Sequence, residues 1–140
     1  MNCRYLGHRD QAGADARLPL LVQVPAVLHF ASVEPLLSRV SFRDHDWTIK
    51  DYLRGVETLQ DSEKPLPGKI GWCIVGTESG PGARWVDNDL VRAVVDECID
   101  AGVPVFVKQI ANDVDRKGGN PEHWPPGVWP RQFPQLGAAR

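Results

Sequence analysis

Three nearly continuous apolar runs organise the chain, at residues 27–33, 70–75 and 103–107. All three are rich in β-branched side chains, and none alternates strictly between polar and apolar positions. Such runs are typical of parallel strands that are covered on both faces. The sequence therefore predicts three buried parallel strands, which begin near Val27, Ile70 and Val103 and lie side by side in one sheet.

The clearest helical pattern lies between the second and third runs. Its apolar positions fall on one stripe, namely Leu90, Val91, Val94, Val95, Cys98 and Ile99. Asp87 or Asn88 can cap this helix at its start. Gly102 stands at its exit, and Pro104 blocks its continuation.

The spacing predicts two further helices. One begins at Asp15, has Pro19 in its first turn and is ended by Pro25. The other lies between the first two apolar runs, and its apolar positions are Ile49, Tyr52, Leu53, Val56 and Leu59. Gly55 is its weak point. The alternation of strands and helices predicts right-handed βαβ units and an α/β fold.

The pattern divides the chain into three parts. Residues 1–13 are polar, show no strand pattern and are predicted to form a flexible amino-terminal stretch. Residues 14–110 hold the βα units of a partial barrel domain. Residues 111–140 form a carboxyl-terminal coil tail, rich in Trp and Pro, that packs on or beside this domain. Within the tail, Asn120 and Pro121 predict one turn of helix.

Charged and polar residues directly follow each apolar run. Glu34 follows the first run, Glu78 and Ser79 follow the second, and Lys108 and Gln109 follow the third. The carboxyl ends of parallel strands lie on one edge of a sheet, and in α/β folds that edge carries the site. These side chains are therefore predicted to meet at one edge. The alternative is that strand-end charges simply face water.

A glycine-rich loop at residues 76–84 follows the second strand. Glycines let backbone N–H groups turn toward an anion, and Arg84 can pair with a phosphate or a carboxylate. The loop matches neither the P-loop pattern nor the dinucleotide-binding glycine pattern. A tight turn that requires positive φ explains the glycines equally well.

Charge and cysteine content narrow the classes of partner. With 16 Lys and Arg against 18 Asp and Glu, the net charge of −2 excludes a strongly basic surface, while a local groove for nucleic acid or a nucleotide stays open. No apolar run approaches the roughly 20 residues that span a bilayer, and no secretory signal opens the chain. The cysteines, Cys3, Cys73 and Cys98, form no CxxC motif. The sequence therefore predicts a reduced cytoplasmic protein with no metal site of its own and no membrane contact.

Four stretches of the chain occur in a recognisable order. The first contains ADARLPLL at 14–21, VPA at 24–26 and FASVEPLL at 30–37. The others are WCIVGTESGPGAR at 72–84, AGVPVFVKQ at 101–109 and DRKGGNP at 115–121. Together they resemble a family of phage and bacterial proteins known only as phage proteins of unknown function, over about residues 10–133. Members of that family look like radical-SAM enzymes, with a distant likeness to spore photoproduct lyase. The resemblance implies a TIM-barrel-like fold and a cytoplasmic protein of a phage-infected or prophage-bearing bacterium.

Full-length members of that family carry an amino-terminal CxxxCxxC-type motif, which holds a 4Fe-4S cluster with one iron open for S-adenosylmethionine. This chain contains no such motif, so the resemblance implies the carboxyl-terminal half of the barrel alone. That half is a partial, TIM-barrel-like parallel sheet of about three βα units. Thr77 stands where the family has the second glycine of GGESG. The resemblance implies a ligand-facing rim that consists of Glu34, Glu78, Ser79, Arg84, Lys108 and Gln109.

Two functions fit these features. The chain is either the substrate-side half of a truncated radical-SAM-like barrel, or a non-catalytic α/β remnant that serves as an interaction module for a partner protein. No residue set supplies a redox centre or an activated nucleophile, so we expect the isolated chain to be inactive. A three-stranded sheet leaves open edges, and a proline-rich tail covers such an edge rather than pairing with it. We therefore expect self-association or binding of the missing amino-terminal half, through a strand edge and the inner face around Phe30, Trp72 and Phe106.

The cysteine spacing generates the first testable prediction, which concerns iron. Anaerobic reconstitution of the purified chain with iron and sulfide should leave its visible absorption spectrum flat, because scattered thiols supply no local cluster motif. A stable brown species that binds about four irons per chain would contradict this expectation.

Overall fold

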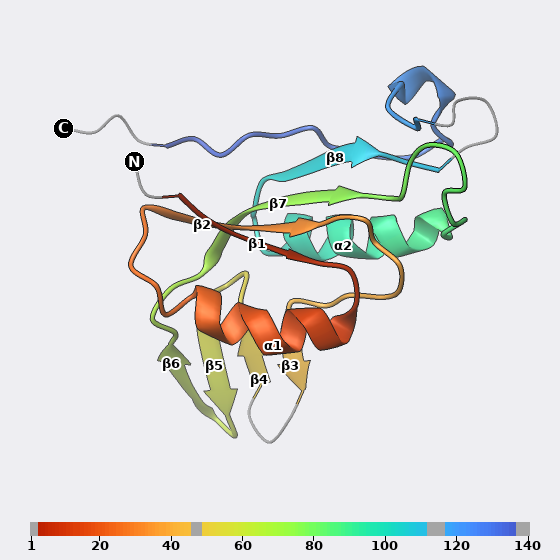
Figure 1. Ribbon diagram of the computed structural model, residues 1–140. Coiled ribbons are helices and arrows are strands. Elements are labelled where there is room, and N and C mark those ends of the chain that lie inside the picture. The colour runs from red at the N-terminus through yellow and green to blue at the C-terminus, as the bar shows by residue number, and fades with distance from the viewer. Residues whose placement is uncertain (1–2, 46–48, 112–116, 137–140) are drawn as a thin grey trace.

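The centre of the fold is a parallel sheet with the strand order β1-β2-β7-β8 (Figure 1). The computed structural model describes residues 3–45, 49–111 and 117–136, and the side chains of residues 3–8 and 45 lie outside this description. The sheet strands are β1 (Cys3–His8), β2 (Leu28–Val33), β7 (Ile70–Gly76) and β8 (Val105–Gln109). Every neighbouring pair in this sheet is parallel. The three predicted strands are thus confirmed as parallel neighbours.

Strand β1 was not expected from the sequence. It pairs with β2 from Cys3 opposite Leu28 to His8 opposite Val33. The prediction that residues 1–13 contain no strand is therefore wrong. The reason is positional, because among the described residues β1 has a strand neighbour on one side alone, and an outermost strand needs no continuous apolar run.

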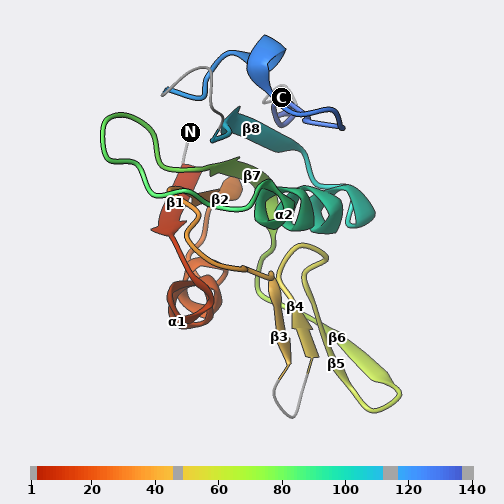
Figure 2. The ribbon, with the colours of Figure 1, turned by 90° about the vertical axis from the view of Figure 1, so that its right-hand side faces the viewer.

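Two helices, α1 (Gln11–Leu21) and α2 (Asn88–Asp100), cover the same face of this sheet (Figure 2). Helix α2 begins as predicted, because the Asp87 side chain accepts the N–H of Asp89. Helix α1 begins earlier than predicted, because Asp10 caps it by accepting the N–H of Gly13 at 2.8 Å. No helix among the described residues combines the length and the apolar character needed to cross a membrane.

The hydrophobic core lies between the sheet and these helices. Strands and helices contribute side chains that are almost wholly buried, among them Leu18, Ala31, Val33, Cys73, Val75, Val91, Val94, Cys98, Val105 and Val107. Side chains alternate between the two faces of a strand, so the intervening positions point away from the helices. On that opposite face Phe30, Trp72, Ile74 and Phe106 are half-buried. We call this side, defined by those four residues, the inner face.

A second sheet is inserted between β2 and β7, where the sequence predicted a helix. Its strands are β3 (Arg43–His45), β4 (Ile49–Asp51), β5 (Val56–Leu59) and β6 (Ser62–Pro65), and each pairs with the next in antiparallel orientation. This sheet projects from the helix side of the parallel sheet (Figures 1 and 2). The predicted helix over these residues is therefore wrong.

A turn at Asp51 replaces the predicted helix. One carboxylate oxygen of Asp51 accepts the N–H groups of Leu53 and Arg54, at 3.1 and 2.9 Å. Gly55 follows with φ +73°, and a Cβ on it would lie 2.9 Å from Cβ of Lys69. A side-chain-to-backbone turn of this kind competes with the helix, and the positive φ ends it.

The tail returns across the sheet after a short 3-10 helix, η1 (Pro121–His123). As predicted, Asn120 caps that turn, and its side chain accepts the N–H of Glu122. The expectation that the tail only covers an edge needs correction, since Arg131 forms one antiparallel bridge with Phe106. Pro130 takes part as an acceptor, which needs no N–H. Residues 112–116 and 137–140 of the predicted tail lie outside the described residues.

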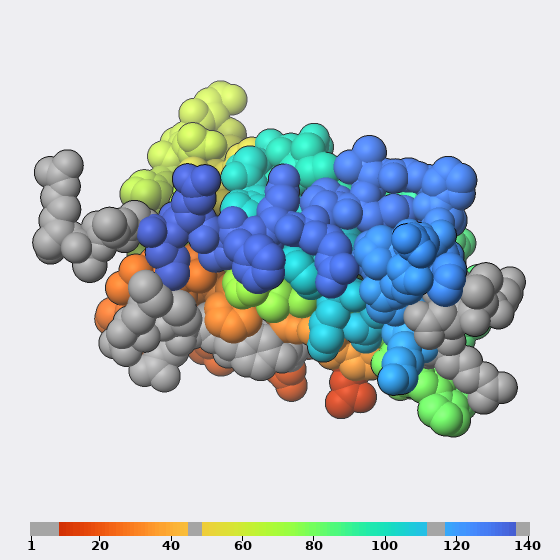
Figure 3. Space-filling model, turned by 90° about the horizontal axis from the view of Figure 1, so that it is seen from above, coloured from red at the N-terminus to blue at the C-terminus, as the bar shows by residue number. Residues whose placement is uncertain are grey.

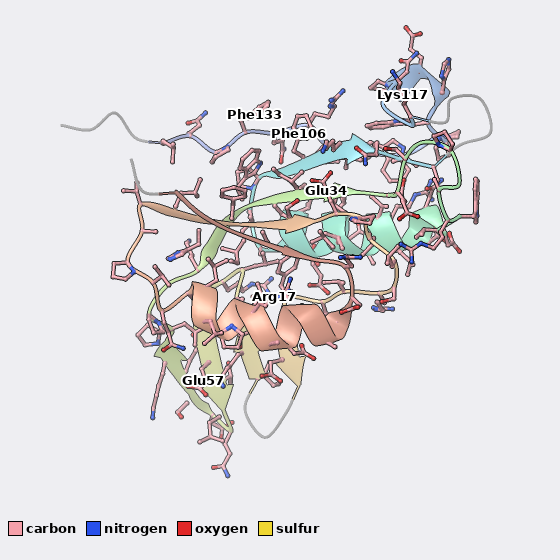
Figure 4. All side chains as sticks on the ribbon, in the orientation of Figure 1. Arg17, Glu34, Glu57, Phe106, Lys117 and Phe133 are labelled. Atoms are coloured by element: carbon pink, nitrogen blue, oxygen red, sulfur yellow. The ribbon has the colours of Figure 1, made fainter. Side chains whose placement is uncertain are left out.

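Aromatic rings join the tail to the inner face. The Phe133 ring centroid lies 5.7 Å from that of Trp72 and 5.1 Å from that of Phe106. Trp72 in turn contacts Phe30 at 5.4 Å. Figure 4 shows Phe106 and Phe133 on the same side of the sheet, and in Figure 3 the dark blue tail runs across this face with parts of β2 and β7 visible beside it. The tail therefore covers the inner face in part.

The position of helix α1 generates a prediction about stability. Leu18 is 1% exposed and Leu20 is 62% exposed on the same helix. We expect Leu18→Ala to lower the free energy of unfolding by about 2–5 kcal/mol, because it leaves a cavity in the core. Leu20→Ala is the matched control, with an expected change within about 0.5 kcal/mol. Denaturant unfolding measures both, and equal effects would contradict the described packing of α1.

Candidate functional site: the carboxyl rim of the parallel sheet

Backbone hydrogen bonds tie the carboxyl ends of the sheet strands together. The N–H of Leu36, just after β2, donates to the carbonyl of Gly76 at the end of β7. The N–H of Thr77 donates to the carbonyl of Gln109 at the end of β8. The N–H of Leu37 donates to the carbonyl of Arg9, which follows β1. The residues beyond all the sheet strands therefore form one continuous rim.

An ion pair between Glu34 and Lys108 lies at the centre of this rim. Lys108 Nζ lies 3.2 Å from Glu34 Oε1, and the hydroxyl of Ser32 donates to Glu34 Oε2 at 2.7 Å. The Glu34 side chain is only 18% exposed, whereas that of Lys108 is 57% exposed. Glu34 lies on the inner-face side of the sheet (Figure 4). The predicted meeting of these two residues at one edge is confirmed.

Gly76 makes this ion pair geometrically feasible. Strand β7 lies between β2 and β8, so the Glu34–Lys108 pair bridges over it. A Cβ on Gly76 would lie 3.2 Å from Glu34 Oε1 and 3.3 Å from Cδ of Gln109. Any side chain at position 76 would therefore push against the two polar side chains that flank it.

Thr77 is held between the same strands. Its side chain is fully buried, and the Gln109 side-chain amide donates to its carbonyl at 2.7 Å. Thr77 Oγ1 has no hydrogen-bond partner within the described part of the chain. Since the backbone of Thr77 is not among the described positive-φ positions, a β-branched residue is tolerated where the resembled family has glycine.

The glycine-rich loop beyond Thr77 is closed by a second ion pair. The Arg84 guanidinium contacts both carboxylate oxygens of Glu78, at 2.9 and 2.8 Å, and the Arg84 N–H also donates to Glu78 at 2.9 Å. Gly80 and Gly82 turn the loop with φ of +92° and +79°. The explanation by a tight turn thus accounts for these two glycines. An anion at this loop would share Arg84 with Glu78.

Arg84 lowers the pKa of Glu78 to about 2, chiefly through its side-chain hydrogen bonds and then through its backbone N–H. The nearby Arg9 charge lowers it further. The same contacts raise the pKa of Arg84 above its usual value. Both groups therefore stay ionised at neutral pH.

The rim thus contains two separate ion pairs rather than one cluster of charged side chains. Glu34, Lys108 and Gln109 meet around Gly76, whereas Glu78 and Arg84 pair with each other on the next loop. The remaining predicted residue, Ser79, is exposed on that loop.

Sequence reasoning missed three contributors to the rim. Ser32 carries a readable signal, because it lies two residues before Glu34 and so faces the same side of the strand. For Gly76 the sequence suggests an anion-binding loop or a tight turn, and neither predicts that it makes room for the Glu34–Lys108 pair. Arg9 was missed because strand β1 was missed.

The described thiols do not fit the 4Fe-4S cluster that the resemblance implies for full-length members. Cys73 on β7 and Cys98 on α2 are fully buried in the core. The hydrogen bond with Cys98 and burial raise the pKa of the Cys73 thiol well above its usual value, whereas cluster ligands are thiolates. Cys3 lies on β1, whose side chains are outside the description. Over the described ranges, no group of three or more His, Cys, Asp or Glu could hold a metal ion.

A cavity of about 820 Å³ lies at the other end of the strands, away from the rim. Loops that precede β2, β7 and β8 line it, together with residues 134–136 of the tail. The cavity contains the buried side chain of His29. Its Nε2 lies 2.6 Å from the carbonyl oxygen of Val24, and this hydrogen bond gives the ring a structural role. The ion pairs therefore lie at the carboxyl ends of the sheet strands, and this cavity lies at their amino ends.

A family model described as "Protein of unknown function (DUF5131)" matches residues 6–123. The matched range contains the whole rim and ends before the tail returns to the sheet. No curated protein and no solved structure matches the chain.

The Glu78–Arg84 pair generates a prediction about pH. The pKa of Glu78 is lowered from its usual 4.5 to about 2, so the pair stabilises the fold fully above pH 4.5, and this contribution is lost as the pH falls toward 2. A side-chain NMR titration should give a midpoint near 2 for Glu78. Arg84→Gln should return the midpoint toward 4.5. A wild-type midpoint near 4.5 would show that the pair does not form in solution.

Proposed function

Because the chain belongs to the DUF5131 family, whose description assigns no activity, we propose a function from the geometry of its own residues. The chain is the ligand-binding half of a TIM-barrel-like domain of phage type and radical-SAM-like ancestry, and its rim binds a small polar ligand. The observation that carries this proposal is the Glu34–Lys108 ion pair, which bridges over Gly76 at the carboxyl ends of three parallel strands. The free thiols Cys73 and Cys98 suit the reducing cytoplasm of a bacterial host.

The one-sided cover of the sheet supports a barrel half. In an open, doubly wound sheet, helices cover both faces. In a TIM barrel, strands follow one another in order, the helices form the outer layer and the inner face points into the barrel. Here β1, β2, β7 and β8 follow in order, and both helices lie on one face (Figure 2). The inner face of this sheet corresponds to the inside of a barrel.

The charges of the rim favour a zwitterionic ligand. An ammonium group would bind the Glu34 carboxylate, which Ser32 holds in place, and an anionic group would bind Lys108. Lys108 is the more exposed partner, so its ammonium group can turn toward a ligand while Glu34 stays fixed. We expect the isolated chain to bind without catalysis, because the resemblance implies the cluster and S-adenosylmethionine for full-length members rather than for this chain.

A second candidate function is that of an interaction module for a second copy of this chain. The half-buried inner face favours it, as does the outer edge of β1, which pairs with no described strand. Each copy supplies four parallel strands, and a closed barrel of this type has eight. In such a pair, β1 of each copy would lie beside β8 of the other around a two-fold axis.

Titration of the isotopically labelled chain with glycine, the simplest amino-acid zwitterion, tests the ligand proposal. We expect saturable shifts of the amide resonances of Gly76, Thr77 and Gln109, because their backbone lies beneath the ion pair. Glu34→Gln and Lys108→Met should each weaken binding at least about tenfold, which corresponds to the loss of one charged hydrogen bond.

Lys50→Met is the matched control, because Lys50 is paired with Glu57 on the inserted sheet, away from the rim. It should leave the glycine titration unchanged. Two results would contradict the proposal: no saturable shift at the rim on addition of glycine, or glycine binding that Glu34→Gln and Lys108→Met leave unchanged.

A further inference from the structure

Residues 130–136 of the tail cover the outer edge of β8. The N–H of Val107 donates to the carbonyl of Pro130 at 2.8 Å, and the N–H of Gln132 donates to the carbonyl of Val105 at 2.9 Å. The indole N–H of Trp72 donates to the carbonyl of Gln132 at 3.0 Å. This segment therefore occupies the place that the next strand of a larger parallel sheet would take.

We propose that residues 130–136 are a strap, which opens independently of the rest of the fold and thereby frees the β8 edge and the inner face for a second copy of this chain. The inference rests on the second candidate function, because it names the edge at which that copy docks. The strand that docks there is β1 of the second copy.

The attachment of the strap is slight compared with that of the strands. Over the described ranges it forms a single bridge, between Arg131 and Phe106, and prolines at positions 130 and 134 prevent a longer ladder. Phe133 remains 67% exposed although its ring contacts two aromatic neighbours. The strap also lies outside the residues that match the family model. Segments with few buried apolar contacts open at low free-energy cost.

The part of the tail before the strap is fixed more firmly. Trp124 is 8% exposed, and its indole N–H donates to the carbonyl of Gly118 at 2.7 Å. The indole N–H of Trp129 donates to the carbonyl of Pro125, and the Arg92 guanidinium on α2 lies 4.9 Å from the Trp129 ring centroid. The hinge of the strap is therefore at Pro130.

Cation–aromatic contacts hold the strap closed. The Arg131 guanidinium lies 4.6 Å from the Phe106 ring centroid and 5.8 Å from that of Trp124. Opening exchanges these contacts, and those of Phe133, for solvent. In a pair of copies, the inner face and the freed backbone groups of β8 would instead be covered by the partner.

Native-state hydrogen exchange on the full chain tests the strap. We expect the amides of Val107 and Gln132 to exchange at least about tenfold faster than that of Cys73, which is bonded to the carbonyl of Pro104 between β7 and β8. Phe133→Ala should speed the two strap-dependent amides by about a further tenfold, which corresponds to loss of one or two aromatic pairs. The Cys73 amide should keep its rate.

Val128→Ala is the control, because Val128 is 73% exposed and precedes the hinge, and it should leave all three rates unchanged. The contrary result is that the Val107 and Gln132 amides exchange at the same rate as the Cys73 amide, both in the wild type and in Phe133→Ala. That result would show that the strap does not open independently, whether the chain is a monomer or a dimer. Fast strap opening in a chain that stays monomeric would support the strap and contradict the docking of a second copy.

Discussion

The arrangement of the protein depends on one constraint, which is that both helices cover the same face of a four-stranded parallel sheet. The core between α1, α2 and the sheet is complete, with side chains such as Leu18, Val75 and Val94 almost wholly buried. The opposite face carries Phe30, Trp72 and Phe106, and among the described residues it is the tail that covers it in part. The parallel sheet therefore has one face that the helices cover and one face that is covered in part. This one-sided cover is the feature on which the proposal of a barrel half rests.

The same constraint places the chemistry. Because the strands run in parallel, the residues that follow them meet at one rim. Because no helix in the described part of the chain covers the inner face, Glu34 and Lys108 can reach each other across β7. Gly76 provides the space for this contact. Glu78 and Arg84 close the next loop and hold the glycine-rich segment in a fixed shape. The charged side chains of the rim are thus paired with one another, and a ligand would have to replace one member of an ion pair in order to bind.

The sequence alone predicts those parts of the fold whose signals are local. Continuous apolar runs identify β2, β7 and β8, and a capping aspartate with an apolar stripe identifies α2. The proximity of Glu34 and Lys108 is also predictable, because each follows a strand and the carboxyl ends of parallel strands lie together. Strand β1 escapes prediction because an outermost strand needs no apolar run.

The inserted sheet escapes prediction for a different reason. Its apolar positions mimic a helical period, while the turn is set by the Asp51 carboxylate and by the positive φ of Gly55. The pairing of the tail with β8 was also missed, because Pro130 lacks a donor but still supplies an acceptor. In both cases the deciding interaction is a hydrogen bond from a backbone N–H to a side chain or a carbonyl. The pattern of apolar residues does not reveal such a bond.

The tail alone does not complete this one-sided sheet. Sedimentation of the purified, folded chain at micromolar concentration tests this most directly. We expect a mass that rises with concentration from the 15.5 kDa of a single chain toward that of a dimer. A cooperatively folded monomer of 15.5 kDa, unchanged over the accessible range of concentration, would show instead that the tail closes the core and that no second copy is needed.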